Sequence, residues 1–152
     1  MIKEFEFYHG AVLSRLAHAD QPVSLKLYPT RSNASYVIND KVGIFVKHSS
    51  KRMSPWGFSF NKTHQDEILE MKNKLEQVFI LLVCFDDGIV TLNFDELKKV
   101  LDDIHRAVEW IRVSRNPREK YSVSGSDGIL KFKIGGNEFP GKILKTFSAV
   151  SG

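Results

Sequence analysis

The spacing of apolar residues near the start of the chain changes from helical to strand-like. Apolar side chains in residues 4–18 recur at helical spacing, which predicts a first helix. Residues 23–28 then alternate between apolar and polar with a period of two, which is typical of a strand. Two further strands are expected at residues 35–39 and 42–48. The intervening Asn39-Asp40-Lys41 predicts a tight hairpin turn, since Asn and Asp tolerate positive φ angles.

A helix followed at once by a wholly apolar segment marks the middle of the chain. Residues 56–60 predict a short fourth strand, and a helix is expected over 64–77 with Thr63 as its N-cap. The run 78–85 contains only apolar residues, which is the pattern of a strand buried on both faces. Another short strand is expected at residues 89–92.

The pattern of apolar and polar residues in the last third of the chain predicts one long helix and then mostly strands and turns. Asn93 and Glu96 form a capping pair before a helix over 94–109. Short strands are expected beyond it, at residues 110–113, 121–123 and 129–134. The sequence contains no linker or repeat, so residues 1–152 are expected to form one mixed α/β domain. Its core would lie at about 4–92, followed by the helix 94–109 and a β-rich extension at 110–147.

Composition is that of an ordinary globular domain. Of the 152 residues, 42% are hydrophobic and 26% are charged, which is enough apolar material for one core without disulfides. The single cysteine, Cys84, lies within the apolar run, so we expect its side chain to be buried. A lone cysteine cannot form an intramolecular disulfide, which favours a reducing compartment for the protein. The chain has no signal-peptide pattern and no apolar run of the roughly 18 residues that a membrane span needs. We therefore expect a cytoplasmic protein with no membrane partner.

Charge is distributed unevenly along the chain. The net charge is +4 and the pI is near 9.2. Residues 1–60 contain eight basic and four acidic residues, residues 61–105 five basic and ten acidic, and residues 106–152 nine basic and four acidic. If the two basic segments lie together in the folded domain, they would form one positive face, which is typical of a protein that binds a polyanion. The alternative is a solvated surface with scattered charge.

Residues 35–52 carry a resemblance to a known family. They read SYVINDKVGIFVKHSSKR, within an order of helix, three strands, helix and buried strand over roughly residues 4–85. This order resembles the core of the PD-(D/E)xK nuclease superfamily, which has the restriction-endonuclease-like fold. In that superfamily an acid opens the second strand, and the third strand ends in Glu-x-Lys before a loop rich in serine and lysine. Lys47 matches the lysine, and Ser49-Ser50-Lys51-Arg52 matches the loop.

The segment after this loop extends the resemblance. Residues 56–60 and then Thr63-His64-Gln65 resemble the edge strand and the helix start that commonly follow in that superfamily. The implied fold is a mixed α/β sheet with the superfamily's helix–three strands–helix–strand core, and the residue pattern adds an extra C-terminal helix and a β-rich extension to it. The implied partner is DNA or RNA.

The sequence departs from the superfamily at the positions that would bind a metal ion. Phe45 stands where the carboxylate of Glu-x-Lys is expected, and Ser35 stands where the first acid is expected. Mg²⁺ prefers carboxylate oxygens, and phosphodiester hydrolysis needs that ion to activate water. Strand parity places Phe45 and Lys47 on one face. We therefore expect no metal site and no cofactor.

Displaced carboxylates are the alternative for catalysis. Asp40 in the hairpin turn is one substitute, and Glu4 or Glu6 in the first helix is another. Asp86 and Asp87 fit a turn better, because Gly88 follows them. If such residues replace the missing ligands, Mg²⁺ is the implied cofactor and Lys47 is a catalytic residue.

Two basic segments are the candidate nucleic-acid contacts. The first combines Lys47, Lys51 and Arg52 with serine donors and ends in an aromatic ring; its members are Lys47, Ser49, Ser50, Lys51, Arg52 and Trp56. Lysine, arginine and serine donors suit phosphate oxygens, and an aromatic ring can stack on an unpaired base. The second segment contains Arg112, Arg115, Arg118 and Lys120. The alternatives are that Trp56 anchors the loop in the core and that the second segment is a solvated loop.

Three functions remain open from the sequence. The first is a nuclease-like domain that binds nucleic acid without the standard metal-dependent cleavage. The second is a non-catalytic interaction or regulatory subunit, in which residues 132–147 contact a protein partner or a second copy of the chain. The third is an active metal-dependent endonuclease with displaced carboxylates. The five histidines and Cys84 have no zinc-ligand spacing, and no phosphate-binding glycine motif is present.

Overall fold

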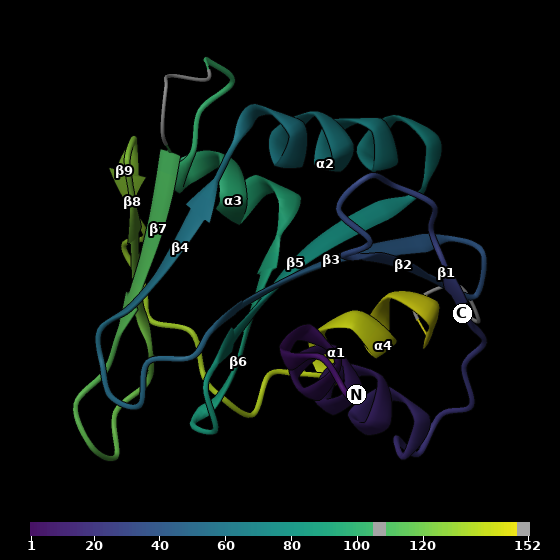
Figure 1. Cartoon of the computed structure of the whole chain (residues 1–152), viewed down its shortest axis with the longest axis horizontal. Coiled ribbons are helices and arrows are strands. Elements are labelled where there is room, and N and C mark those ends of the chain that lie inside the picture. The colour runs from purple at the N-terminus through teal and green to yellow at the C-terminus, as the bar shows by residue number, and fades with distance from the viewer. Residues whose placement is uncertain (105–108, 149–152) are drawn as a thin grey trace.

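A five-stranded mixed sheet runs through the middle of the molecule, and a four-stranded antiparallel sheet packs beside it (Figure 1). The computed structural model describes residues 1–104 and 109–148. The helices are α1 (Glu4–Ala17), α2 (Lys62–Lys74), α3 (Phe94–Val100) and α4 (Gly141–Ser148). The strands are β1 (Leu25–Leu27), β2 (Ser35–Ile38), β3 (Val42–Ser49), β4 (Trp56–Phe60), β5 (Gln77–Cys84), β6 (Gly88–Asn93), β7 (Glu109–Ser114), β8 (Ser122–Gly125) and β9 (Gly128–Ile129).

The first sheet has the strand order β1-β2-β3-β5-β6. β3 and β5 are parallel, and the other neighbours are antiparallel. Helix α2 lies between β3 and β5 in the chain, as a parallel pair requires a long crossover. The helix sits close to β3 because Gly43 has no side chain. A Cβ there would lie 2.9 Å from the Leu75 side chain and 3.0 Å from the Met71 sulfur.

The second sheet joins segments that are far apart in the sequence. Its order is β4-β7-β8-β9, with all neighbours antiparallel. Phe58 of β4 faces Ile111 of β7 in the ladder. β4, which follows β3 in the chain, is therefore an edge strand of the second sheet and not part of the first. In β4 and β7, buried and exposed residues alternate, so one face packs inward and the other faces solvent.

The core consists of two apolar clusters on the two faces of the first sheet. One cluster contains side chains from β3, β5, α2, α3 and the inward face of the second sheet, including Phe45, Phe60 and Ile111. The other contains side chains from α1, α4, β3 and β5. Figure 1 accordingly shows α1 and α4 on the opposite side of the first sheet from α2. From Val78 to Cys84 every residue of β5 is buried, which confirms the predicted doubly buried strand.

Two turn and cap predictions are confirmed. Asn39 and Asp40 have φ angles of 53° and 57°, and the Lys41 N–H donates to the Ile38 carbonyl at 3.1 Å. Asn93 accepts from the Glu96 N–H at 2.8 Å, and the Glu96 carboxylate accepts from the Asn93 N–H at 2.9 Å. Both are short-range features that depend on residues a few positions apart.

Two helices have different limits from those predicted. Helix α2 covers 62–74 rather than 64–77, because Asn61 and not Thr63 is the N-cap; its side chain accepts from the His64 N–H at 2.8 Å. Helix α3 ends at Val100 rather than at residue 109. The Asp127 N–H donates to the Val100 carbonyl at 3.0 Å, so the turn between β8 and β9 stops the helix. Residues 105–108 of the predicted helix lie outside the described residues.

The predicted β-rich extension contains a helix instead of a third long strand. In the predicted strand 129–134, Ile129 lies in β9 and Ile134 forms an isolated bridge with Tyr121. Residues 141–148 then form α4, and Phe139, Ile143 and Leu144 are buried in the cluster beneath α1. The prediction of a mixed α/β fold is confirmed; the extension predicted as β-rich contains β7, β8 and β9, and also the helix α4, which was not predicted.

Two further observations concern Cys84 and the helices. Cys84 is free and fully buried, as predicted, and burial raises the pKa of its thiol. Within residues 1–104 and 109–148, each helix is too short or too polar to cross a membrane.

Candidate nucleic-acid interface

The end of β3 has an open edge on one side. Pairing between β2 and β3 stops at Ser35 and Phe45, and the Val46 N–H donates to the Ala34 carbonyl at 2.9 Å. β3 continues to Ser49, paired with β5 on its other side. The chain before Ser35 turns away, so the last residues of β3 border a hollow instead of another strand.

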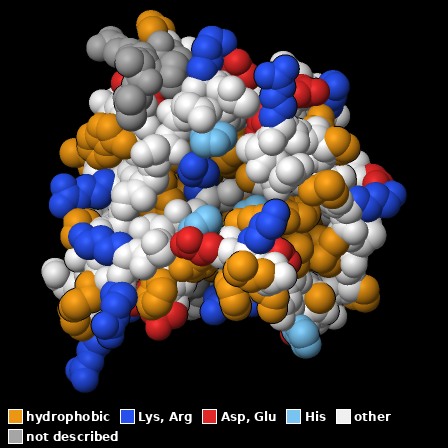
Figure 2. Space-filling model, viewed as in Figure 1, with side chains coloured by type: hydrophobic (Ala, Val, Ile, Leu, Met, Phe, Trp, Pro, Cys, Tyr) orange, Lys and Arg blue, Asp and Glu red, His pale blue; other side chains and the backbone are white. Residues whose placement is uncertain are grey.

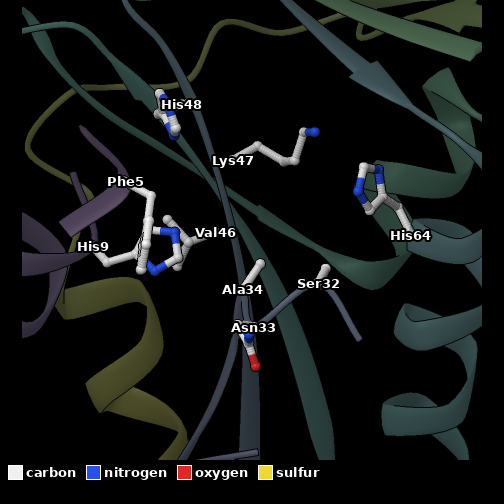
Figure 3. A pocket seen from close by; sticks show the side chains of 9 residues that line it. All are labelled: Phe5, His9, Ser32, Asn33, Ala34, Val46, Lys47, His48 and His64. Carbon is white, nitrogen blue, oxygen red and sulfur yellow. The ribbon is translucent and has the colours of Figure 1, made fainter. Parts of the chain in front are cut away.

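This hollow has a volume of about 280 Å³ and is bordered by one lysine and three histidines, Lys47, His9, His48 and His64. Figure 3 shows Lys47 and His64 on one side of β3 and His9, His48 and Phe5 on the other. The alternation of a strand explains this arrangement, because Lys47 and His48 are consecutive residues. In Figure 2 basic and histidine side chains gather around a hollow near the centre of the face.

Lys47 is half-buried and forms no ion pair with a described acidic residue. Its ammonium group lies 5.5 Å from the centre of the Phe60 ring, and burial lowers its pKa. None of the ion pairs between described residues includes Lys47. A cation that is partly removed from water and has no counter-charge is a suitable partner for an anion.

Burial keeps the two histidines on the α1 side of the hollow uncharged near neutral pH. His9 Nδ1 lies 2.8 Å from the Tyr36 hydroxyl, and burial, with a smaller effect from His48, lowers its pKa to about 4. The His48 ring stacks on Tyr8 with centroids 4.3 Å apart, and its pKa is lowered chiefly by burial although Glu4 lies 3.7 Å away.

The third histidine belongs to the start of α2. The His64 Nδ1 atom accepts from the Asn61 N–H at 3.3 Å, which completes the N-terminal cap. Burial and then the charge of Lys47 lower the pKa of His64. The lowered pKa values favour the uncharged forms of the three imidazoles at neutral pH, so Lys47 is the main positive charge among the residues that line the hollow.

The positions that would hold a metal ion in the resembled family carry no carboxylate. Ser35 lies directly opposite Phe45 in the ladder, and both are fully buried. The Ser35 hydroxyl has no hydrogen-bond partner among the described residues. The Phe45 ring packs on the rings of Phe60 and His64, at centroid distances of 6.4 and 5.6 Å. An aromatic contact thus fills the space where oxygen ligands would be needed.

The substitute carboxylates considered from the sequence lie elsewhere. Asp40 pairs with Lys26 at 3.1 Å, and the strand from Val42 to Lys47 rises about 17 Å, so Asp40 and Lys47 are at opposite ends of β3. Glu6 accepts from the backbone N–H of the α1 N-cap. Glu4 comes closer to the hollow, but it contacts His48 and not Lys47. Asp40 is therefore not a partner of Lys47.

Two other acidic features were not predicted. Glu67 of α2 is buried and accepts from the backbone N–H and the hydroxyl of Ser32, which borders the hollow. Its position on a helix after the loop gave no sequence signal. Asp102, Glu109 and Asp127 place carboxylate oxygens within 4.8 Å of one another. Nothing besides proximity points to an ion there, so no function is assigned to that group.

Trp56 is an anchor of the loop and is not exposed for stacking. It is 2% exposed, its indole N–H donates to the Lys51 carbonyl at 2.8 Å, and its ring packs edge-on against Tyr121. This corrects the expectation that Trp56 stacks on a base. Trp110, which the sequence reasoning did not select, is 45% exposed on β7.

The structure brings the two basic segments together. Lys51 and Arg112 border one groove of about 510 Å³ along β4 and β7, and Arg52 and Arg115 border a cavity of about 200 Å³. The Arg115 N–H donates to the Ser54 hydroxyl at 3.1 Å, which ties the loop after β3 to the end of β7. Segments about sixty residues apart in the sequence therefore form one surface.

The basic residues of this surface differ in availability. The Arg115 guanidinium donates twice to Asp87, with both distances 2.6 Å, and lies over the Tyr121 ring. It is therefore engaged inside the protein and is a poor phosphate contact, contrary to expectation. Arg118 and Lys120 are exposed in the loop after β7. At the end of β3, Ser49 is half-buried and Ser50 is exposed.

Comparison of the chain with family models, with curated proteins and with solved structures finds no match.

Proposed function

We propose that this protein is a nucleic-acid-binding domain with a nuclease-like core and without metal-dependent cleavage at the end of β3. The observation that carries the proposal is the half-buried Lys47 ammonium, which has no carboxylate partner in the described structure. Lys47 lines a hollow of about 280 Å³. A phosphate group is the anion that best fits a lysine with adjacent imidazoles, and the loop beyond β3 adds further cations.

The order of elements supports the nuclease-like part of the proposal. The first sheet contains β1, β2 and β3, then β5 after the helix α2, with α1 before them. Apart from β4, which lies between β3 and α2 in the chain and belongs to the second sheet, this order is similar to the helix–three strands–helix–strand order of the resembled superfamily. Lys47 lies toward the end of β3, two residues beyond Phe45, which pairs with Ser35 at the start of β2; this position is similar to that of the superfamily's lysine.

The surroundings of Lys47 support binding through phosphates. Lys51 and Arg52 follow it in an exposed loop, and Arg112 lies beside that loop on β7. Such contacts neutralise phosphate charge and release bound counterions, so affinity should fall steeply with salt. The proposed absence of cleavage rests on Ser35 and Phe45, because a lone hydroxyl and an aromatic ring are poor ligands for Mg²⁺.

The test is binding of labelled DNA and RNA by fluorescence anisotropy over a range of salt concentrations. Lys47→Ala should weaken binding to every sequence. The slope of log affinity against log salt should become shallower by about one unit, which corresponds to the loss of one phosphate contact. Lys74→Ala is the control, because Lys74 is exposed on α2 and paired with Glu70. It removes the same charge but should leave affinity unchanged. Absence of binding by the wild-type protein at low salt would refute the proposal.

A cleavage assay with Mg²⁺ or Mn²⁺ tests the second half of the proposal. The expected result is no metal-dependent cleavage by the wild-type protein. Cleavage that Glu67→Gln or Glu4→Gln abolishes would instead show that displaced carboxylates hold the ion. If nucleic acid does not bind and a protein is retained specifically, the interaction-subunit alternative replaces the proposal.

A further inference from the structure

The outward face of the second sheet is a shallow platform of small residues around one aromatic ring. Strand alternation turns the apolar residues of β4, β7 and β8 toward the core and leaves the others facing solvent. The outward residues are Gly57, Ser59, Trp110, Arg112, Ser122 and Ser124, all exposed or half-buried. This sheet lies on the left in Figure 1.

The face of the Trp110 ring has no large neighbour across the ladder. Trp110 lies opposite Ser59 of β4, and its backbone N–H donates to the Ser126 hydroxyl at 2.8 Å. Arg112 lies opposite Gly57 on one side and Ser124 on the other. A Cβ added at Gly57 would meet no atom within 4 Å, so the space above β4 is open.

The groove beside this ring carries positive charge only. Trp110, Lys51 and Arg112 border it together, and its volume is about 510 Å³. Among the described residues that line it, none carries a carboxylate, and the ion pairs of the described chain include neither Lys51 nor Arg112. An exposed ring flanked by two uncompensated cations complements a ligand that has both a flat ring and an anionic group.

We propose that this groove binds single-stranded nucleic acid, with an unpaired base stacked on Trp110 and the adjoining phosphates held by Lys51 and Arg112. The inference rests on the proposed function and adds the class of substrate. In a duplex both faces of each base are covered by neighbouring bases, whereas an unpaired base offers a free face to an aromatic ring. The platform therefore favours single strands over duplexes.

The two tryptophans allow a direct test, because only one of them is exposed. Trp56 is 2% exposed and Trp110 is 45% exposed. Oligothymidylate should quench the fluorescence of Trp110 and should protect it from acrylamide, a neutral quencher. Both effects should disappear in Trp110→Phe, which keeps a stacking ring but removes the fluorophore.

Affinity measurements with matched variants complete the test. Trp110→Ala should weaken binding of oligothymidylate roughly 5- to 150-fold, the range for loss of one base–aromatic stack. Binding of a blunt duplex, which relies on phosphates, should change less than twofold. Phe7→Ala is the control, because Phe7 is an aromatic residue 63% exposed on α1, on a different surface. It should leave the affinity for both ligands unchanged.

The outcomes separate the two proposals. If Trp110→Ala leaves single-strand affinity unchanged while Lys47→Ala lowers it, the stacking platform is refuted and the proposed function stands. If no oligonucleotide binds to the wild-type protein at low salt, both fail. If the wild-type protein is a dimer that Trp110→Ala dissociates, and oligonucleotide does not compete, the platform is a contact between two copies.

Discussion

His9 links helix α1 to strand β2 and is the most strongly perturbed histidine of the site. It is 6% exposed, contacts the Tyr36 hydroxyl, and meets the Phe5 ring edge-on at 5.2 Å. Burial favours its neutral form, which is why its pKa is lowered to about 4.

We expect the free energy of unfolding to fall as the pH decreases from about 6.5 to 4. The unfolded chain takes up a proton on His9 below its ordinary pKa of 6.5, while the folded protein does not do so until about pH 4. The contribution of His9 is complete above pH 6.5, and its loss amounts to about 3 kcal/mol at the acid end. Urea unfolding at pH 7 and pH 4.5 measures it. His9→Gln should show a smaller pH-dependent loss, and an equal loss would contradict the role of His9.

The residues of the site were only partly predictable. Lys47, Lys51, Arg52 and Arg112 were selected because cationic side chains near a loop are a local signal, and these residues do border hollows. The sequence could not distinguish the two tryptophans. Trp56 lies on the same face of β4 as Phe58 and Phe60, and all three side chains pack inward. Trp110 lies between the buried residues Glu109 and Ile111 of β7 and therefore faces outward.

At the scale of elements, local signals predicted more than long-range ones. The apolar run of β5, the hairpin at Asn39 and Asp40, and the Asn93 cap all depend on neighbouring residues. Pairing between β4 and β7 joins residues about fifty positions apart, which no periodicity reveals. The end of α3 was missed for the same reason, because the groups that stop it come from Asp127.

Helix α4 was missed because its eight residues follow glycines and a proline that usually indicate turns. Its position against the first sheet makes it part of the core. The Lys142 ammonium donates to the Glu96 carboxylate at 2.8 Å and to the Thr91 carbonyl at 2.9 Å, which fixes the helix beside β6 and α3. Within residues 132–147, the side chains of Ile134, Phe139, Ile143 and Leu144 are buried in the core, whereas Phe132 is exposed.

We expect Ile143→Ala to lower the free energy of unfolding by about 2–5 kcal/mol. Ile143 is fully buried, so the substitution removes apolar contacts and leaves a cavity in the cluster shared with α1. Chemical denaturation measures the change. Lys145→Ala is the control, because Lys145 is exposed on the same helix and its loss should cost less than about 0.5 kcal/mol. A small effect of Ile143→Ala would mean that α4 is not docked.

At the scale of the whole molecule, one polar cluster joins the two sheets. Asp87 lies in the turn between β5 and β6 of the first sheet. Arg115 and Tyr121 flank the loop between β7 and β8 of the second sheet, and both donate to the Asp87 carboxylate. The hydrogen bonds from Arg115 are the main reason why the pKa of Asp87 is lowered. This cluster and the shared apolar core hold the sheets side by side.

We expect Asp87→Ala to destabilise the protein by about 2–3 kcal/mol, because it removes several charge-assisted hydrogen bonds and leaves the Arg115 guanidinium without a counter-charge. Thermal unfolding of Asp87→Ala and of Asp86→Ala provides the comparison. Asp86 is the exposed neighbour, so its replacement should change stability by no more than about 0.5 kcal/mol. Equal effects of the two substitutions would mean that the Asp87 cluster adds nothing to the contact between the sheets.

The distance in sequence between β5 and α4 has a consequence for synthesis of the protein on the ribosome. Phe79, Leu81 and Val83 of β5 share a cluster with Ile143 of α4, which emerges roughly 60 residues later, about 3–12 s at ordinary translation rates. During that interval α1 is the available cover for this apolar surface. Nascent chains that pause before Gly141 therefore expose part of the apolar face of β5. We expect chaperones to recognise this form of the protein.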